Sequence, residues 1–159
     1  MRDIDKTVKD VLTPHGFVFK KSSWYRTSNG LIQIINFQKS QFANRYYMNL
    51  GIDERTGQDF IYKPEYQFPV RLRVDMIISD KQLIDALDYE KECSEISRNE
   101  KMEVLILSSI NFLDSINDWG KLKSAMKNKK HPVHNAFITT SFTEKINDKH
   151  VNFFALQKT

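Results

Sequence analysis

Apolar and polar residues alternate through residues 17–52, as they do in β-strands that pack one face on a core. The dipeptide Asn29-Gly30 separates two runs of this kind, at residues 24–28 and 31–38. Asn and Gly tolerate the positive φ angles of a two-residue type I′ turn, so the dipeptide predicts a β-hairpin. Such a turn pairs Ser28 with Leu31, Arg26 with Gln33, Tyr25 with Ile34, and Trp24 with Ile35.

This register divides the hairpin side chains between two faces of the sheet. One face carries Trp24, Leu31, Ile35 and Phe37, and the other carries Tyr25, Ile32, Ile34, Asn36 and Gln38. Because both faces are partly apolar, we expect the hairpin to lie inside a larger sheet, with the Trp24 face on the main core.

Two further segments alternate in the same way and complete a four-stranded antiparallel meander. In residues 45–52 the inward positions are Tyr46, Met48, Leu50 and Ile52, and the outward ones are Tyr47, Asn49 and Gly51. In residues 70–77 the inward positions are Val70, Leu72, Val74 and Met76, and the outward ones are Arg71, Arg73 and Asp75.

Helical periodicity precedes and follows these strands. Residues 3–15 predict an amphipathic helix that ends at Gly16, or earlier because of Pro14. After residue 78 we expect a helix capped by Ser79, a second helix over residues 101–116 that is apolar on most sides, and a short segment with Leu122 and Met126. Residues 137–142 and 151–156 have strand composition around Asn147-Asp148 and favour a terminal hairpin, although a helix there remains open.

Strands followed by helices indicate an α+β fold, with an N-terminal helix and two or three C-terminal helices on one face of the sheet. The length of 159 residues suits a single domain over 1–159, in which residues 120–159 form a C-terminal extension.

Charge and cysteine content narrow the class of protein further. The net charge of +4 is modest, so it indicates neither nucleic-acid nor membrane binding by itself. The only cysteine, Cys93, excludes an internal disulfide and has acidic neighbours, so we expect no reactive role for it. The charged start and the short apolar run at 104–107 show no secretory signal or membrane span, so we expect a cytoplasmic location.

Several short elements resemble a known family. They are Gly16-Phe17, then Trp24-Tyr25-Arg26, then residues 36–40 (Asn-Phe-Gln-Lys-Ser) and residues 47–52 (Tyr-Met-Asn-Leu-Gly-Ile), followed by an arginine at Arg71 or Arg73. In this order they resemble the bacterial DUF4304 family over about residues 8–115. The resemblance implies the fold but no activity. Some proteins of this kind look like toxin-neutralising or defence accessory proteins, which would make this chain a protein-binding module.

The outward face of the predicted sheet is the first candidate site. It would carry Tyr25, Asn36, Gln38, Tyr47, Asn49, Arg71 and Arg73. Tyr and Arg are favoured anchors of protein interfaces, so this face could bind another protein. The alternative is an ordinary solvated face of a one-sided sheet.

Two other clusters have simpler explanations. Lys121, Lys123, Lys127, Lys129 and Lys130 could contact phosphates, but no aromatic residues lie between them to stack on bases, which favours a solvated turn. His131 and His134 have a spacing that could bind a metal on a helix, but Pro132 argues against a helix and further ligands are missing.

No segment matches a catalytic signature, so we expect a binding protein rather than an enzyme, and neither a cofactor nor a metal. Weak nucleic-acid binding through residues 121–130 and an enzyme with an unrecognised site are the alternatives. We expect a monomer, or a dimer joined through an exposed strand edge.

Overall fold

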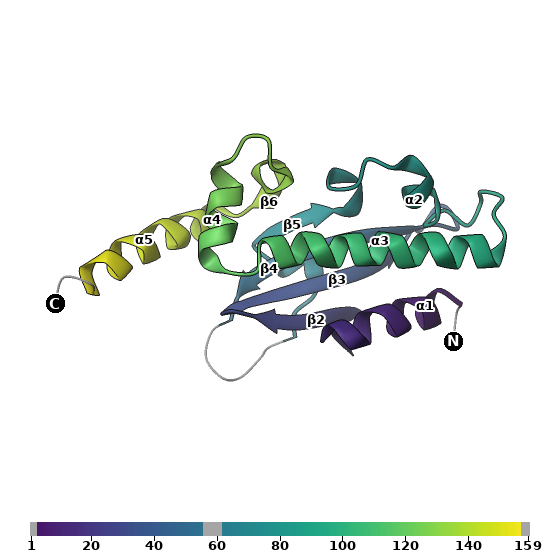
Figure 1. Ribbon diagram of the computed structural model, residues 1–159, viewed down its shortest axis with the longest axis horizontal. Coiled ribbons are helices and arrows are strands. Elements are labelled where there is room, and N and C mark those ends of the chain that lie inside the picture. Colours follow the sequence, from purple (N-terminus) through teal and green to yellow (C-terminus); the bar gives the residue numbers. More distant parts are fainter. Residues whose placement is uncertain (1–2, 56–61, 157–159) are drawn as a thin grey trace.

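A computed structural model describes residues 3–55 and 62–156 (Figure 1). The helices are α1 (Asp3–Leu12), α2 (Lys81–Asp85), α3 (Glu95–Ser115), α4 (Trp119–Lys127) and α5 (Thr140–Leu156). The strands are β1 (Val18–Lys20), β2 (Ser23–Ser28), β3 (Leu31–Lys39), β4 (Tyr46–Glu54), β5 (Val70–Arg73) and β6 (Phe137–Ile138). All six form one antiparallel sheet in the order of the chain, and α2, α3 and α4 lie between β5 and β6. The fold is α+β, as the sequence predicts, with a helix before the strands and helices after the first five of them.

The hairpin between β2 and β3 has the predicted register. Ser28 pairs with Leu31, Arg26 with Gln33, Tyr25 with Ile34 and Trp24 with Ile35. Asn29 and Gly30 have φ angles of 46° and 82°, the positive values that the turn requires. The dipeptide therefore determines which side chains of both strands face the core.

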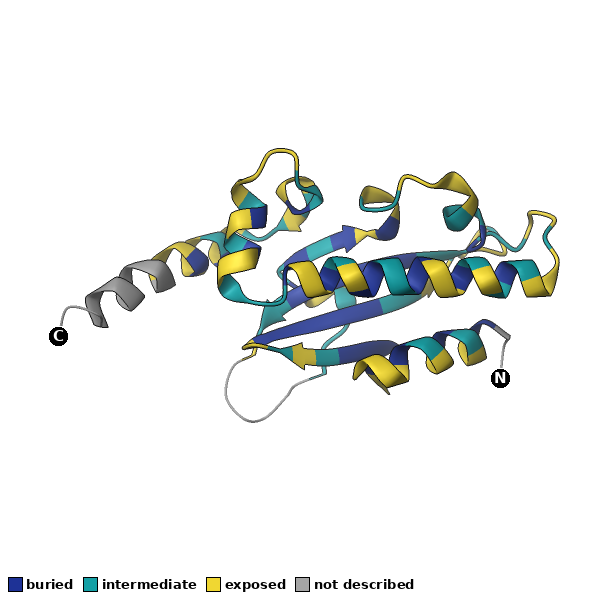
Figure 2. Ribbon diagram, in the orientation of Figure 1, coloured by how far each residue is buried: buried dark blue, intermediate teal, exposed yellow. Residues whose placement is uncertain are grey.

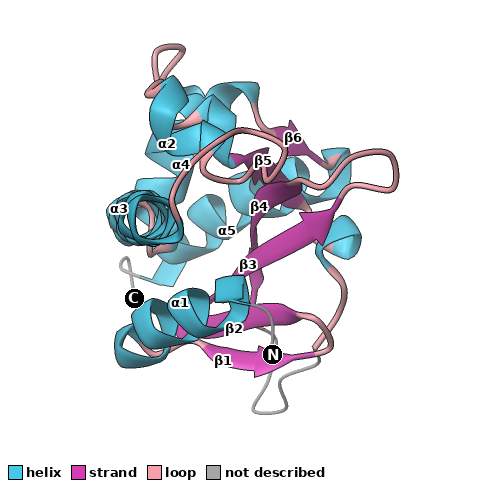
Figure 3. Ribbon diagram, turned by 90° about the vertical axis from the view of Figure 1, so that its right-hand side faces the viewer, coloured by secondary structure: helices cyan, strands magenta, loops and turns pink. Residues whose placement is uncertain are grey.

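Helices α1 and α3 lie side by side on one face of the sheet, which we call the inner face (Figure 3). The main core lies between these two helices and the sheet. It includes Trp24, Leu31, Ile35 and the inward residues of β4, as predicted. The same apolar cluster extends along the chain from Ile4 to Ile146, and the α3 residues that face the sheet are buried along the helix (Figure 2).

A second, smaller core covers part of the opposite, outer face. Tyr25, Ile32 and Ile34 lie there beneath Phe68, with Tyr62 packed against them. Gly51 makes this possible, because a Cβ at that position would lie 2.6 Å from Ile34 Cγ2 and 3.0 Å from Phe68 Cγ. The outer face is therefore open only in part.

The sheet has six strands, two more than the predicted four. Strands β1 and β6 add one short strand at each edge. The predicted strand over residues 70–77 ends at Arg73, and Val74–Met76 forms a 3-10 turn. Val74 still reaches the core, but Met76 is 39% exposed because the turn breaks the alternation.

Helix boundaries also differ from those predicted. Helix α1 ends at Leu12 and a 3-10 turn with Pro14 leads to Gly16 at φ 81°, in line with the predicted early stop. Helix α2 is capped by the Asp80 carboxylate rather than by Ser79. Helix α3 begins at Glu95, six residues before the predicted start, after Ser94 accepts a hydrogen bond from the Ser97 N–H.

The predicted terminal hairpin is wrong. Only Phe137 and Ile138 form a strand, and the chain then enters α5, in which Asn147 and Asp148 are helical. Phe142 and Ile146 stand four residues apart and both are buried, so the helical period outweighs the β-branched composition of this segment.

Candidate binding surface on the outer sheet face

Five of the seven predicted site residues lie together on the open part of the outer face. We call this group the polar strip, and it consists of Asn36, Gln38, Tyr47, Asn49 and Arg73. The register of β3, β4 and β5 places Gln38 opposite Tyr47, and Asn49 between Asn36 and Arg73. The strip therefore crosses three neighbouring strands.

Tyr25 does not belong to this surface, contrary to the prediction. Its side chain is fully buried in the second core, and its hydroxyl donates a 2.7 Å hydrogen bond to the Lys63 carbonyl. Burial raises the pKa of the Tyr25 phenol above its ordinary value. The sequence placed Tyr25 on the correct face, but the covering segment around Phe68 follows a loop and carries no periodic signal.

The amide side chains of the polar strip are held by hydrogen bonds. Asn49 is nearly buried and donates to Gln38 Oε1 at 3.2 Å, and Asn36 donates to Ser23 Oγ at 2.9 Å. These contacts satisfy buried polar groups and keep the strands in register. Asn36 and Asn49 therefore support the surface, while Gln38, Tyr47 and Arg73 present it to solvent.

Tyr47 lies under two arginines. The guanidinium carbon of Arg73 is 4.7 Å from the centre of the Tyr47 ring, and that of Arg45 is 5.2 Å away. Arg73 also pairs with Asp75 at 3.0 Å, but both partners of this ion pair are largely exposed, so it contributes little stability. Stacking orients both guanidinium groups and leaves N–H donors for a carboxylate.

Arg71, the seventh predicted residue, borders the strip beside β6. Its guanidinium carbon lies 4.1 Å from the centre of the Phe137 ring, and its Nε is buried without a hydrogen-bond partner. Glu65 is its acidic neighbour: burial raises the pKa of the Glu65 carboxyl, and the charge of Arg71 opposes this rise.

A pocket of about 270 Å³ opens beside the strip, where β5 ends. Arg45, Tyr47 and Arg73 line it together with the buried side chains of Met48, Val74 and Leu87. Its remaining lining residues are Tyr46, Asp75, Ile84, Asp85, Asp88 and Lys91. It thus combines apolar residues with three cationic and three acidic ones.

The far wall of the pocket is held by Arg98 from α3. This buried arginine donates to the carbonyl oxygens of Ala86, Asp88 and Lys91 at 2.8–2.9 Å. The segment that it holds joins the edge of β4, where the Tyr46 N–H donates to the Leu87 carbonyl. Arg98 and Arg45 are not among the residues predicted from the sequence. The signal for Arg98 is a charged residue on the same helical face as Met102, Leu105 and Ser109.

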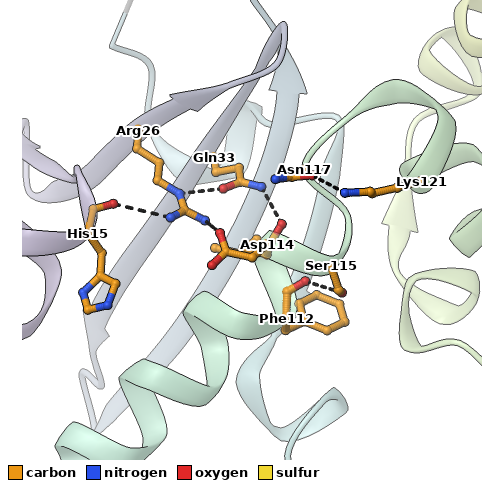
Figure 4. Close-up of polar contacts among 9 residues, drawn as sticks. His15, Arg26, Gln33, Phe112, Asp114, Ser115, Asn117 and Lys121 are labelled. Atoms are coloured by element: carbon orange, nitrogen blue, oxygen red, sulfur yellow. Dashed lines mark hydrogen bonds and ion pairs between the residues drawn. The ribbon is translucent and has the colours of Figure 1, made fainter.

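Another polar cluster lies on the inner face, near the end of α3 (Figure 4). Arg26 contacts Gln33, the Asp114 carboxylate and the His15 carbonyl, and Gln33 donates to the Leu113 carbonyl at 2.8 Å. Each polar group of Gln33, which is fully buried, therefore has a partner. We interpret the cluster as structural, because it joins β2, β3 and the ends of two helices.

The lysine cluster lies on α4 and the turn after it. Lys121 donates to Asn117 Oδ1 at 3.0 Å, whereas Lys127, Lys129 and Lys130 are exposed. No residue of this group lines the pocket beside the polar strip. The arrangement adds no observation in favour of nucleic-acid binding.

His131 and His134 do not converge on a common point. His131 Nδ1 accepts the Val133 N–H, and its ring stacks on Phe112, while His134 Nδ1 contacts the Met126 carbonyl. Among the residues that the structure describes, no group of three His, Cys, Asp or Glu side chains could hold a metal ion. Cys93 lies in the loop before α3.

The comparisons with known proteins identify the class. The model of the family described as "Domain of unknown function (DUF4304)" matches residues 8–106, more than half of the chain. The chain belongs to the DUF4304 family. No curated protein and no solved structure matches it significantly. Within the described part of the chain, no helix has both the length and the apolar character needed to cross a bilayer.

Proposed function

We propose that this protein is a binding module that holds an acidic segment of another protein on its outer sheet face. The observation that supports this most strongly is the pair of guanidinium groups over Tyr47, from Arg45 and Arg73. Pre-oriented arginines with free donors recognise carboxylates at low entropic cost.

Charge on this surface favours an acidic partner. Among the described residues, Arg45 and Arg71 form no ion pair, and Arg73 has only the exposed pair with Asp75. Tyr and Arg are also the residue types that most often carry the binding energy of protein interfaces. An acidic toxin that the module neutralises would fit this chemistry, with the bacterial cytoplasm as the setting.

An affinity purification with four matched baits tests the proposal. The wild-type bait should retain a stoichiometric acidic protein, and the Arg73→Ala and Tyr47→Ala baits should lose it, since anchor residues contribute about 2 kcal/mol or more, roughly 30-fold in Kd. Lys20→Ala serves as the control, because Lys20 is an exposed cation at the opposite edge of the same face. Equal retention by all four proteins would refute the sheet-face site.

The setting can be tested separately. Cell fractionation of the native host should recover the protein with cytoplasmic markers. Recovery with periplasmic or secreted proteins would contradict this part of the proposal.

A further inference from the structure

We propose that the pocket beside the polar strip binds the C-terminal residue of the partner chain: its carboxylate and one apolar side chain. This inference rests on the proposed function and names the part of the partner that is recognised. It depends on how the edge of β4 is interrupted beside Tyr47.

The edge of β4 has a gap between two partners. Strand β5 pairs with β4 as far as Asn49, opposite Arg73, and Asp88 forms an isolated bridge with Arg45, the residue before β4. The Tyr46 N–H also bonds to the Leu87 carbonyl, so only Tyr47 and Met48 lie between these contacts, a length of about 7 Å at the rise of a β-strand. Because both ends of the gap are closed, a passing strand cannot lie along it, whereas the end of a chain can enter.

One backbone donor faces this gap. Backbone groups alternate along a strand, and the Tyr46 N–H points to this edge, where it donates to the Leu87 carbonyl at 2.8 Å. The Met48 N–H, two residues on, points the same way and lies one residue beyond the last pair of β4 with β5, Asn49 with Arg73. It is placed to donate to a carboxylate in the gap.

The charges that line the pocket balance in number, but one arginine among them has no ion pair. Of its three cationic and three acidic residues, Arg73 pairs with Asp75 at 3.0 Å and Lys91 with Asp85 at 2.6 Å. Asp88 accepts the Glu90 N–H. Arg45 and Asp88 therefore both remain without an ion pair among the described residues. Arg45 and the outer donors of Arg73 offer N–H groups to an incoming carboxylate.

The buried apolar residues of the pocket favour a ligand that carries an apolar group as well as an anion. Met48, Val74 and Leu87 are each less than 5% exposed, and they form the apolar part of the pocket. At about 270 Å³ the pocket is smaller than the usual small-molecule site, so it suits one side chain. A C-terminal Leu, Val or Phe supplies the carboxylate and the apolar side chain from one residue, which an internal Asp or Glu does not.

Titration of the ¹⁵N-labelled full chain with short peptides tests this proposal. The probes are acetyl-Gly-Gly-Leu, acetyl-Gly-Gly-Val and acetyl-Gly-Gly-Phe, each as the free acid and as the C-terminal amide. At least one free acid should shift the Met48 amide resonance saturably, and its amide should bind about tenfold or more weakly. Arg73→Gln should weaken binding by a similar factor, and Lys20→Gln should leave the affinity unchanged.

Three results would overturn the inference: amides that bind as well as acids, no saturable shift up to about 10 mM of any probe, or shifts confined to other parts of the chain. Equal binding of isovalerate would also overturn it, since it would indicate a small branched carboxylate rather than a chain end. If the peptides fail while the partner still depends on Arg73 and Tyr47, only the chain-end inference falls and the proposed function stands.

Discussion

At the scale of single residues, Gly51 allows Phe68 to pack closely on the outer face of the sheet beside Ile34. Replacing it by alanine would place a Cβ 2.6 Å from Ile34 Cγ2 and against Phe68. We expect Gly51→Ala to lower the free energy of unfolding by about 1–3 kcal/mol, the usual cost of overpacking. Gly120→Ala is the control: its Cβ meets only Asp118 Oδ1 at 3.4 Å, so urea denaturation should show little or no loss for it. Equal losses for both variants would contradict this account of Gly51.

Glu65 provides a prediction about pH. Its pKa in the folded protein is raised by burial, so the folded protein binds this proton more tightly than the unfolded chain does. The contribution of Glu65 to stability is therefore fully present below its unfolded pKa of about 4.3 and is lost as the pH rises through its raised folded value. The stability of Glu65→Gln minus that of the wild type should accordingly increase between about pH 4 and 7, as measured by thermal unfolding across that range. A difference that falls over this range would contradict the raised pKa.

The same carboxylate lies beside Arg71 and competes for it. Glu65→Gln should therefore strengthen the binding of an acidic partner, most clearly at low salt, where exposed charges are screened least. Weaker binding by this variant would show that Glu65 contacts the partner or orders Arg71.

At the scale of elements, Arg98 links α3 to the wall of the pocket. Arg98→Met removes three donors from buried carbonyl contacts, so it should cost about 2–4 kcal/mol of stability. Hydrogen exchange should accelerate most at the Tyr46 and Tyr89 amides, which donate to the carbonyls of Leu87 and Asn44 and so join this segment to the start of β4. Lys101→Met, one turn further along α3 and partly exposed, is the control and should leave these amides protected. Uniform acceleration across the sheet in Arg98→Met would show global destabilisation instead.

Elements could be predicted from the sequence where the turn residues and the period of apolar positions match the way the element packs in the fold. The Asn29-Gly30 turn fixed the hairpin register, and period-two alternation placed the inner and outer residues of β4 correctly. Residues 70–77 continued to alternate, yet the chain turns after Arg73, because local alternation does not encode where a strand loses its neighbour. In α5 the β-branched composition misled, and the buried pair Phe142 and Ile146 carried the correct period.

The candidate site also has a part that could be predicted from the sequence and a part that could not. Polar positions on the outer strands could be found by alternation, so five of the seven predicted residues lie together. The burial of Tyr25 and the pocket beside β5 could not, because both depend on segments brought to the sheet by loops. Long-range contacts of this kind leave no periodic trace in a single sequence.

At the scale of the whole molecule, the chain should unfold as one unit. Its main apolar cluster contains residues from Ile4 to Ile146, and Trp119 stacks on Phe142 beside the hairpin turn at Gly30. We therefore expect residues 1–159 to behave as a single domain, including the extension over 120–159. Single-tryptophan variants that retain either Trp24 or Trp119 should show the same urea midpoint by fluorescence and by far-UV circular dichroism. An earlier transition for Trp119 would show that the extension unfolds separately.

The central claim is that the outer sheet face binds a protein, and photo-crosslinking in living cells tests it most directly. A photoreactive phenylalanine analogue replaces Gln38, which is exposed in the polar strip, or Lys127, which is exposed on α4. We predict that the probe at position 38 crosslinks one acidic protein, that Arg73→Glu abolishes this product, and that the probe at position 127 yields none. Crosslinks from position 127 with none from position 38 would contradict the account and place the partner on the lysine cluster.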